Sequence, residues 1–435
     1  MKKRMLLAVL AAAAVISVFA GGKSDDGTAA GGPVTLSVYM QLDLADPRYA
    51  YWPETVAAFE AQHPEIKLDF EYVADEQFHD KFQTMAAAGA IPDVFTCYAG
   101  ARSNYILDRG AVKDLRPYLT DAFKANYNAA LWQPQGPNGE IYIISPNMAV
   151  CTEVYINTKL LRELNLTKAV TLEEMIAQVP AIRAAGYTPL MFANKGQWQA
   201  SSFLLSMLVH RMGGTAWFDK AMTGEAKFTD KPFVDALAIV KRMVDERLFP
   251  AGVNQMEGHE GWGEFVRGNA VYLLEAGYRI GAIQNAADPA DFAQYEVMAF
   301  PAVPGEIIKG SSAATLGQAL AMNKNLSGAK AEAAWKFLSF IYGPVGADIF
   351  VKHGNVSTYK LDYSKYNLDT LNRQYIGLIE DQPMGYVIDA KMNGEGVNRV
   401  LNPGIQAVMM GAKTPAQLAA EYEAWVAAND TNRKR

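Results

Sequence analysis

The sequence has few of the residue patterns that are typical of metal sites or of catalytic nucleophiles. Its histidines are scattered, without an H-E-x-x-H motif, at positions 63, 79, 210, 259 and 353. The G-x-S-x-G elbow, the Walker A loop and a G-x-G-x-x-G run after a strand are also absent. We therefore predict no metal, no cofactor and no enzyme activity. A glycosidase pair of carboxylates stays open, because 46 acidic residues offer too many pairs for spacing to decide.

Cysteine is nearly absent. The chain has two, Cys97 and Cys151, and they are not at metal-ligand spacing. In an oxidising compartment they could pair, but they fall in segments that we expect in different halves of the fold, where a disulfide would prevent relative motion. We predict two small buried hydrophobic residues and keep the disulfide as the minor alternative.

Clusters of positive charge are also scarce. The formal net charge is −6, and the only basic run, Arg433-Lys434-Arg435, ends the sequence, where we expect a frayed tail. An acidic chain without a basic patch is a poor ligand for nucleic acid or for anionic membranes. We therefore predict that its partners are neither of these.

One apolar run stands near the N-terminus, from Met5 to about Ile16, after Lys2, Lys3 and Arg4. This pattern predicts a signal peptide over residues 1–20, cleaved after Ala20. Residues 21–33 (GGKSDDGTAAGGP) have almost no large apolar side chain and predict a flexible tether. Because no lipobox cysteine is near the cleavage site, we expect a protein that is free in the periplasm.

Strands and helices alternate in the first part of the mature chain. Residues 34–39 and 66–72 predict strands, residues 52–62 predict a helix, and a further strand begins at Val94. Phe78, Phe82 and Met85 predict one buried face of a helix that stops at Gly89. Such alternation is typical of an α/β fold with a mostly parallel sheet, whose ligands bind beyond the carboxyl ends of the strands. A chain of this length predicts two lobes.

Several segments resemble one known family. They are KFQTMAAAGAIPDVF (81–95), FEAQHPEIKLDFEY (59–72), LDRGAVKDLRPYL (107–119), FVRGNAVYLLEAGY (265–278) and AKAEAAWKFLSFIY (329–342). In their order along the chain, these segments resemble segments of the bacterial extracellular solute-binding proteins, family 1, which are sugar-type receptors of ABC importers. The resemblance covers most of residues 34–355. Residues 361–435 match loosely, through GAKTPAQLAAEYEAW.

The resemblance implies a two-lobed periplasmic-binding-protein fold, in which each lobe is a mostly parallel sheet flanked by helices. Lobe I would comprise residues 34–144 and 313–355, and lobe II residues 145–312 and 356–435. Hinges are expected near residues 144–145, 312–313 and 355. The lobes would close over a solute by hinge motion, and the closed monomer would dock on permease subunits in the inner membrane.

Candidate ligand contacts come from strand ends and aromatic residues. In lobe I the resemblance implies the loops that carry Gln41 and Tyr98. In lobe II it implies Tyr278, where the family usually has tryptophan. The alternative for each aromatic residue is ordinary core or rim packing. The predicted ligand-binding residues are Gln41, Tyr98, Trp198, Trp262, Glu275, Tyr278 and, from a polar cluster near the C-terminus, Asn398.

Together these observations predict a receptor for a sugar, either a monosaccharide or an oligosaccharide, since aromatic faces and polar groups are what carbohydrate binding requires. Two alternatives remain open at this point. One is a binding protein for a solute that is not a sugar, and the other is a secreted carbohydrate-active enzyme.

Overall fold

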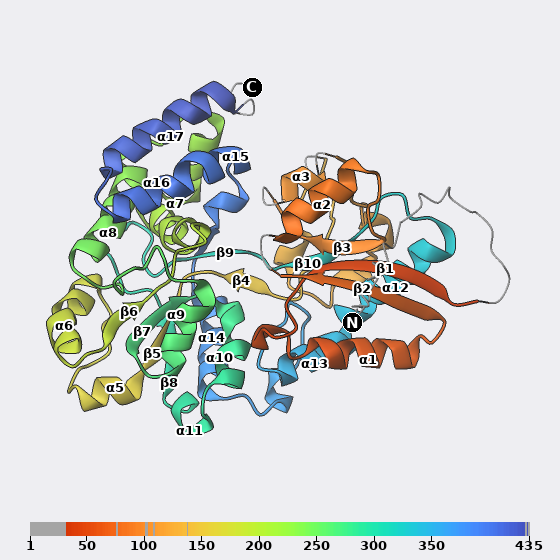
Figure 1. Ribbon diagram of the computed structural model, residues 1–435, viewed down its shortest axis with the longest axis horizontal. Coiled ribbons are helices and arrows are strands. Elements are labelled where there is room, and N and C mark those ends of the chain that lie inside the picture. The colour runs from red at the N-terminus through yellow and green to blue at the C-terminus, as the bar shows by residue number, and fades with distance from the viewer. Residues whose placement is uncertain are drawn as a thin grey trace, which may run out of the picture.

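The first strand, β1 (Val34–Gln41), lies inside a four-stranded sheet. It pairs in parallel with β2 (Ile66–Val73) and with β3 (Val94–Cys97), and β10 (Ala319–Met322) joins β3 in antiparallel orientation. The strand order is therefore β10-β3-β1-β2. We call this sheet and the helices packed on it lobe I (Figure 1). Those helices are α1 (Trp52–Gln62), α2 (Gln77–Ala87), α3 (Asn104–Leu107), α4 (Asp121–Lys124), α12 (Gly328–Ile341) and α13 (Pro344–Lys352).

The computed structural model describes residues 32–74, 77–100, 103–107, 109–136, 138–430 and 433. The predicted signal peptide (1–20) and almost all of the predicted tether (21–33) lie outside this range. None of the described helices is both long and apolar enough to cross a membrane.

Helix α2 and strand β3 illustrate how the sequence pattern produces lobe I. Phe78 and Phe82 are buried on the predicted face of α2, and Met85 is half-buried on the same face. Gly89 ends this segment with a φ of 70°, a conformation that glycine adopts without steric cost. All four residues of β3 are buried, so their side chains fill both faces of the sheet.

A second sheet forms lobe II. Its order is β6 (Thr188–Met191), β7 (Ala270–Glu275), β5 (Glu153–Asn157) and β8 (Tyr295–Ala299). The mostly parallel sheet that we expected in each lobe has the same form in both, with three strands in one direction and one antiparallel strand, β10 in lobe I and β5 in lobe II. In lobe II, β6 and β7 are parallel, but β5 is antiparallel to both β7 and β8. The reason is that β5 enters from lobe I and runs away from it, while β7 and β8 run towards it; β10 enters lobe I in the same way.

Helices cover lobe II on both sides of its sheet (Figure 1). They are α5 (Thr158–Glu163), α6 (Leu172–Ala184), α7 (Ser206–Thr223), α8 (Lys231–Asp245), α9 (Gly258–Val266), α10 (Ile280–Ala286), α11 (Pro289–Phe292), α14 (Thr370–Asp381), α15 (Gly394–Gly396), α16 (Asn402–Met409) and α17 (Pro415–Asn429). Helix α6 begins with the capping box of Thr171 and Glu174, each side chain bonded to the other's backbone N–H. Asn157 caps α5 by accepting from the Leu160 N–H at 3.1 Å.

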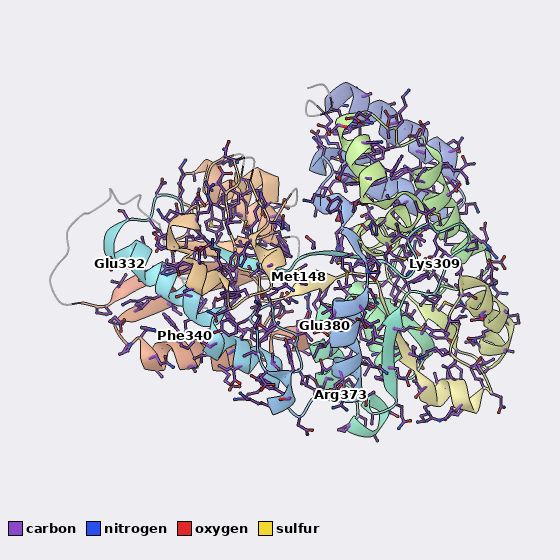
Figure 2. The ribbon with its side chains drawn as sticks, turned by 180° about the vertical axis from the view of Figure 1, so that it is seen from behind. Met148, Lys309, Glu332, Phe340, Arg373 and Glu380 are labelled. Carbon is purple, nitrogen blue, oxygen red and sulfur yellow. The ribbon has the colours of Figure 1, made fainter. Side chains whose placement is uncertain are left out.

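A third sheet, made of three short strands, lies at the junction of the two lobes. β4 (Met148–Val150), β9 (Ser312–Leu316) and β11 (Met384–Tyr386) form a sheet in the order β11-β9-β4. Figure 2 shows Met148 at the start of β4, between Phe340 on α12 of lobe I and Glu380 on α14 of lobe II. At the lobe I end, the buried Ser145 hydroxyl donates to the Gly317 carbonyl at 3.0 Å, which joins two crossing segments. The domain boundaries and hinge positions stay predictions.

Two further expectations concern single residues. The two cysteines do not form a disulfide with each other, and both are buried, Cys97 in the core of lobe I and Cys151 in that of lobe II, as the preferred interpretation predicts. The expectation of a frayed basic tail is wrong for Arg433. Its guanidinium pairs with Glu423 at 3.0 Å and donates to the Ala226 carbonyl at 2.8 Å, so lobe II holds this residue.

Candidate ligand-binding site

A cavity of about 1140 Å³ lies between the two lobes. Lobe I contributes the segment after β1 and the end of β3, and lobe II contributes the segments around Trp198, Trp262 and Tyr278. The two crossovers, which are the segments with β4 and β9 that pass between the lobes, also line the cavity. Ligand pockets of drug-sized molecules measure about 300–1,000 Å³, so this cavity is large enough for a solute of several hundred daltons.

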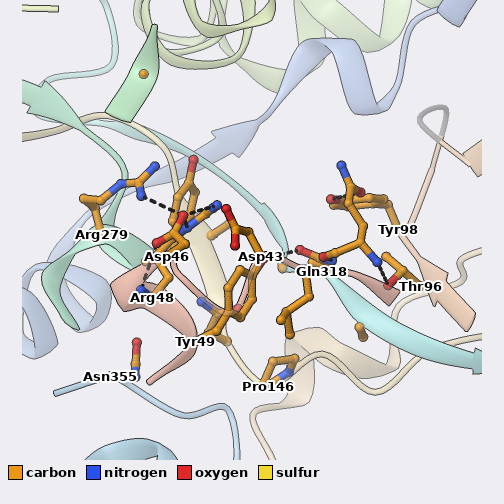
Figure 3. A pocket seen from close by; sticks show the side chains of 18 of the residues that line it. Asp43, Asp46, Arg48, Tyr49, Thr96, Tyr98, Pro146, Arg279, Gln318 and Asn355 are labelled. Atoms are coloured by element: carbon orange, nitrogen blue, oxygen red, sulfur yellow. Dashed lines mark hydrogen bonds and ion pairs between the residues drawn. The ribbon is translucent and has the colours of Figure 1, made fainter. Parts of the chain in front are cut away.

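The lobe I wall is a chain of hydrogen-bonded side chains (Figure 3). The Tyr98 hydroxyl donates to the side-chain oxygen Oε1 of Gln41 at 2.8 Å. The backbone N–H of Gln41 donates to Thr96 Oγ1 at 2.9 Å. Gln318, on the second crossover, donates to the Gln41 carbonyl at 2.6 Å and accepts from the Tyr49 hydroxyl at 3.0 Å. The polar groups of this wall are therefore held in position before a ligand arrives.

The turn Asp46–Tyr49 of lobe I reaches lobe II at one end of the cavity. Asp46 caps the short 3₁₀ helix Pro47–Tyr49 and pairs with the Arg48 guanidinium at 2.7 Å. Asp46 Oδ2 also lies 3.8 Å from Arg279 Nη1 of lobe II, and the Arg48 guanidinium carbon lies 5.9 Å from the centre of the Tyr278 ring. In Figure 3 these side chains converge beneath Arg279. The lobes are thus in direct contact through opposite charges and a cation–π pair.

Burial and charge act in opposite directions on the carboxyl groups here. Burial would raise the pKa of the Asp46 carboxyl, but the charge and hydrogen bonds of Arg48, together with Arg279, hold this pKa below its usual value. Burial raises the pKa of the Glu275 carboxyl, against the nearby charge of Arg279. Asp46 is therefore the ionised partner that the two arginines share.

Aromatic rings and polar groups form the lobe II wall. Trp262 lies on α9, which begins with a capping box between Glu257 and Glu260. The Arg279 guanidinium carbon lies 5.4 Å from the centre of the Trp262 ring and 5.6 Å from that of Tyr278. Trp198 packs edge-on against Phe203, with ring centres 5.5 Å apart. The wall thus combines apolar ring faces with a buried cation.

The structure brings most of the predicted site residues together. Those lining the cavity are Gln41, Tyr98, Trp198, Trp262 and Tyr278. Glu275 lies behind this wall, 6% exposed, where it accepts from the adjacent Ala276 N–H at 2.9 Å. It is close to the cavity through Arg279, at 3.7 Å, rather than by lining it.

Asn398 is away from the cavity. It is exposed on the turn Val397–Leu401 and is not among the residues that line the cavity in the described part of the chain. The polar cluster that suggested it has local partners. Asn393 caps α15 by accepting from the Glu395 N–H at 3.0 Å, and Glu395 pairs with Arg399 at 3.1 Å. Helical spacing, rather than a ligand, accounts for the cluster.

The sequence analysis missed several cavity residues. Among them are Asp46, Arg48, Arg279 and Gln318. Asp-Pro-Arg after a strand is a turn signal that could have drawn attention to Asp46 and Arg48. Arg279 and Gln318 have no such signal, because the lobe I residues that they meet, Asp46 for Arg279 and Gln41 and Tyr49 for Gln318, are more than two hundred residues away in the sequence. Among the described residues, no cluster of three or more His, Cys, Asp or Glu side chains could hold a metal ion.

Comparisons with known proteins agree with this architecture. A family model described as bacterial extracellular solute-binding protein matches residues 44–348. A putative binding protein of Brucella abortus is 23% identical over 374 residues, which cover 84% of this chain and 86% of that protein. An ABC transporter extracellular-binding protein of Pyrococcus horikoshii is 22% identical over 259 residues; they cover 56% of this chain and only 58% of that relative's length.

Two solved structures show the same fold. One comes from work on xylan utilization by the thermophilic bacterium Caldanaerobius polysaccharolyticus; its TM-score is 0.80 at 21% identity, covering 90% of this chain and 100% of that one. The other is a maltose/maltodextrin-binding domain from Bdellovibrio bacteriovorus bound to maltotriose, with a TM-score of 0.74 at 16% identity, covering 91% and 100%. These structures share the two-lobed α/β architecture with the present chain.

Proposed function

This chain belongs to the bacterial extracellular solute-binding proteins, the non-enzymatic receptors of ABC importers, and we propose that the solute it binds is a carbohydrate, either a monosaccharide or an oligosaccharide. The family membership excludes the enzyme alternative that the sequence left open. The solute class rests on the chemistry of the cavity.

The observation that carries this proposal is the cavity wall, in which aromatic rings from both lobes lie beside fixed hydrogen-bonding groups. Sugars present C–H faces that stack on aromatic rings, and hydroxyl groups that need both donors and acceptors. Tyr98, Trp198 and Tyr278 supply rings, and the side chains of Gln41 and Gln318 supply polar atoms. The charged groups of the wall are largely paired with each other, which favours a neutral solute over a charged one.

Hinge closure follows from the two-sided site. A solute that contacts both lobes gains more binding free energy in the closed state than in the open state, so binding shifts the population to the closed state. The closed monomer would then present both lobes to permease subunits, and we propose that it does so free in the periplasm.

A fluorescence titration tests the carbohydrate proposal. We expect tryptophan emission to change when a panel of neutral mono- and oligosaccharides is added, because ligand burial changes the surroundings of Trp198 and Trp262. The matched variants are Trp198→Phe, which removes a cavity indole, and Trp335→Phe, which removes an indole stacked on Tyr118 of lobe I with ring centres 5.0 Å apart. The sugar response should fall in the first variant and persist in the second.

The contradicting results are equally specific. A fluorescence response to amines or oxyanions, with no response to any sugar, would contradict the carbohydrate proposal and indicate another class of solute. Recovery of a shortened oligosaccharide after incubation, seen by chromatography, would show turnover and contradict a receptor.

A further inference from the structure

A small niche lies in the lobe II wall, behind the aromatic residues of the cavity. Its volume is about 20 Å³, and it shares Gln199, Trp262, Tyr278 and Arg279 with the large cavity. Phe203 and Leu273 supply apolar walls, and Glu275 closes its inner side. A space of this size holds about one water-sized group.

Three residues that line the niche carry buried polar atoms without a hydrogen bond, although the two Arg279 nitrogens lie 3.7 and 3.8 Å from the carboxylates of Glu275 and Asp46. Within the described part of the chain, Arg279 Nε and Nη1, Trp262 Nε1 and Gln199 Oε1 are buried and make no hydrogen bond. Each residue is more than nine-tenths buried, with exposed fractions of 7%, 8% and 7%. A buried polar atom that is left without a partner destabilises the protein, so native structures pair such atoms with water or ligand. The niche therefore needs an oxygen atom in it.

The chemistry of these atoms describes the group that fits. Three N–H donors and one carbonyl acceptor match a hydroxyl, which accepts from Arg279 or Trp262 and donates to Gln199. The space is too small for a sugar ring, so the hydroxyl must project from the ring on a short arm.

Charge argues against a carboxylate in this place. The Arg279 guanidinium already has two carboxylates near it, Glu275 at 3.7 Å and Asp46 at 3.8 Å. A third negative group would be repelled by both in a buried site. A neutral hydroxyl adds hydrogen bonds without adding charge.

We propose that the niche binds the exocyclic hydroxymethyl group of a pyranose ring that lies between the lobes, and that this group displaces a water molecule. This proposal rests on the proposed carbohydrate function and adds a rule of specificity. The receptor binds hexopyranoses more tightly than the matching pentopyranoses, which lack the hydroxymethyl group.

Titration calorimetry with matched sugars tests the rule. The pairs are D-glucose and D-xylose, D-galactose and L-arabinose, and cellobiose and xylobiose, whose members differ only in hydroxymethyl groups. In any pair that binds, we expect the affinity for the hexose to be about tenfold or more higher than that for the pentose. The reason is that with the pentose only water can pair with the buried donors. Equal affinity, or a tighter pentose, overturns the proposal.

Two variants distinguish a niche that binds the hydroxymethyl group from residues that only pack in the protein. Trp262→Phe keeps an aromatic ring and removes the N–H, and Gln199→Leu removes the acceptor; thermal unfolding establishes that each variant folds. Because both residues also line the large cavity, either variant should weaken the hexose about fivefold more than it weakens the pentose. Equal weakening of both sugars would show a structural role only and overturn the niche. If the wild-type protein binds none of the sugars in the wider panel, the carbohydrate function itself fails, and the niche proposal fails with it.

Discussion

The two lobes differ in how they satisfy their buried polar groups. Among the residues that the structure describes, lobe I has one buried side-chain atom without a hydrogen-bond partner, the hydroxyl of Tyr127. Lobe II and its junction with the crossovers have many. They include atoms of Glu153, Gln199, His210, Trp262, Arg279, Gln284, Ser311, Ser312, Asn372, Tyr375, Gln382 and Asn402.

This difference indicates that the two walls of the cavity have different roles in binding. The lobe I wall is held by its own hydrogen bonds, from Tyr98 through Gln41 and Gln318 to Tyr49. The lobe II wall keeps donors and acceptors that only water, protonation or a ligand can satisfy. Lobe I thus provides a preformed surface, while lobe II gains the most from closing on a solute.

The largest expected effect concerns Glu153, at the start of β5. Burial raises the pKa of its carboxyl to about 8, and the nearby Gln382 side chain, which does not reach hydrogen-bond geometry, and the charge of Arg211 only partly oppose this. The neutral acid is therefore the stable form in the folded protein. Its stabilising contribution is complete below the ordinary value of 4.5 and is lost as pH rises through about 8.

The variant Glu153→Gln should remove this loss. We expect it to be more stable than the wild type at pH 9 by a few kcal/mol, with an upper limit of about 5 kcal/mol, and to differ little at pH 4. Urea unfolding at both pH values measures the difference. The exposed Glu163→Gln is the control and should be neutral at both. Equal stability of Glu153→Gln and the wild type at pH 9 would mean that the buried acid carries no penalty.

The second effect concerns the contact between the lobes. Asp46→Asn keeps the cap of the turn but removes the charge that faces Arg48 and Arg279. We expect a larger radius of gyration in solution scattering without ligand, and about tenfold weaker sugar binding, because the closed state loses an ion pair that is partly buried.

The sign of the pH dependence provides a further check on this pair. Because the pKa of Asp46 is lowered, its contribution is complete above the ordinary value of 3.8 and is lost as pH falls below it. Asp43→Asn is the control in scattering, since Asp43 caps its own turn by accepting from the Ala45 N–H at 2.9 Å. An unchanged envelope for Asp46→Asn would contradict a role for this pair in closure.

The smallest effect concerns Tyr127, the exception in lobe I. Tyr127→Phe removes a buried hydroxyl that has no partner, so we expect it to be neutral or to stabilise by up to about 1 kcal/mol. Tyr363→Phe is the matched change, because that hydroxyl accepts from the Ser357 N–H at 3.0 Å and donates to the Ser357 carbonyl at 3.2 Å. It should destabilise by about 1 kcal/mol in urea unfolding. Similar losses for both variants would mean that Tyr127 has a partner in solution, such as a bound water.

Local patterns predicted the elements and several cavity residues. Phe78 and Phe82 mark a buried helix face by their spacing alone, and Gly89 marks its end, so α2 and β3 follow from neighbours in the sequence. Gln41 and Tyr98 were found because they follow the ends of parallel strands and because the family resemblance implies ligand contacts in these two loops. Asn398 was placed in the site by composition, and composition says nothing about which face of a turn is exposed.

The amino-acid order by itself determined the alternation of strands and helices and the position of the strand ends, because hydrophobic periodicity and turn residues act over a few positions. The two-lobed family was indicated by the resemblance of several segments to its members. Only the tertiary structure decided that β5 runs antiparallel to its neighbours, that Asp46 meets Arg279, and that Trp262 and Gln199 leave polar atoms facing one niche. These contacts join residues that are distant along the chain. Their geometry depends on how two separately packed cores are set against each other, and no local pattern encodes that arrangement.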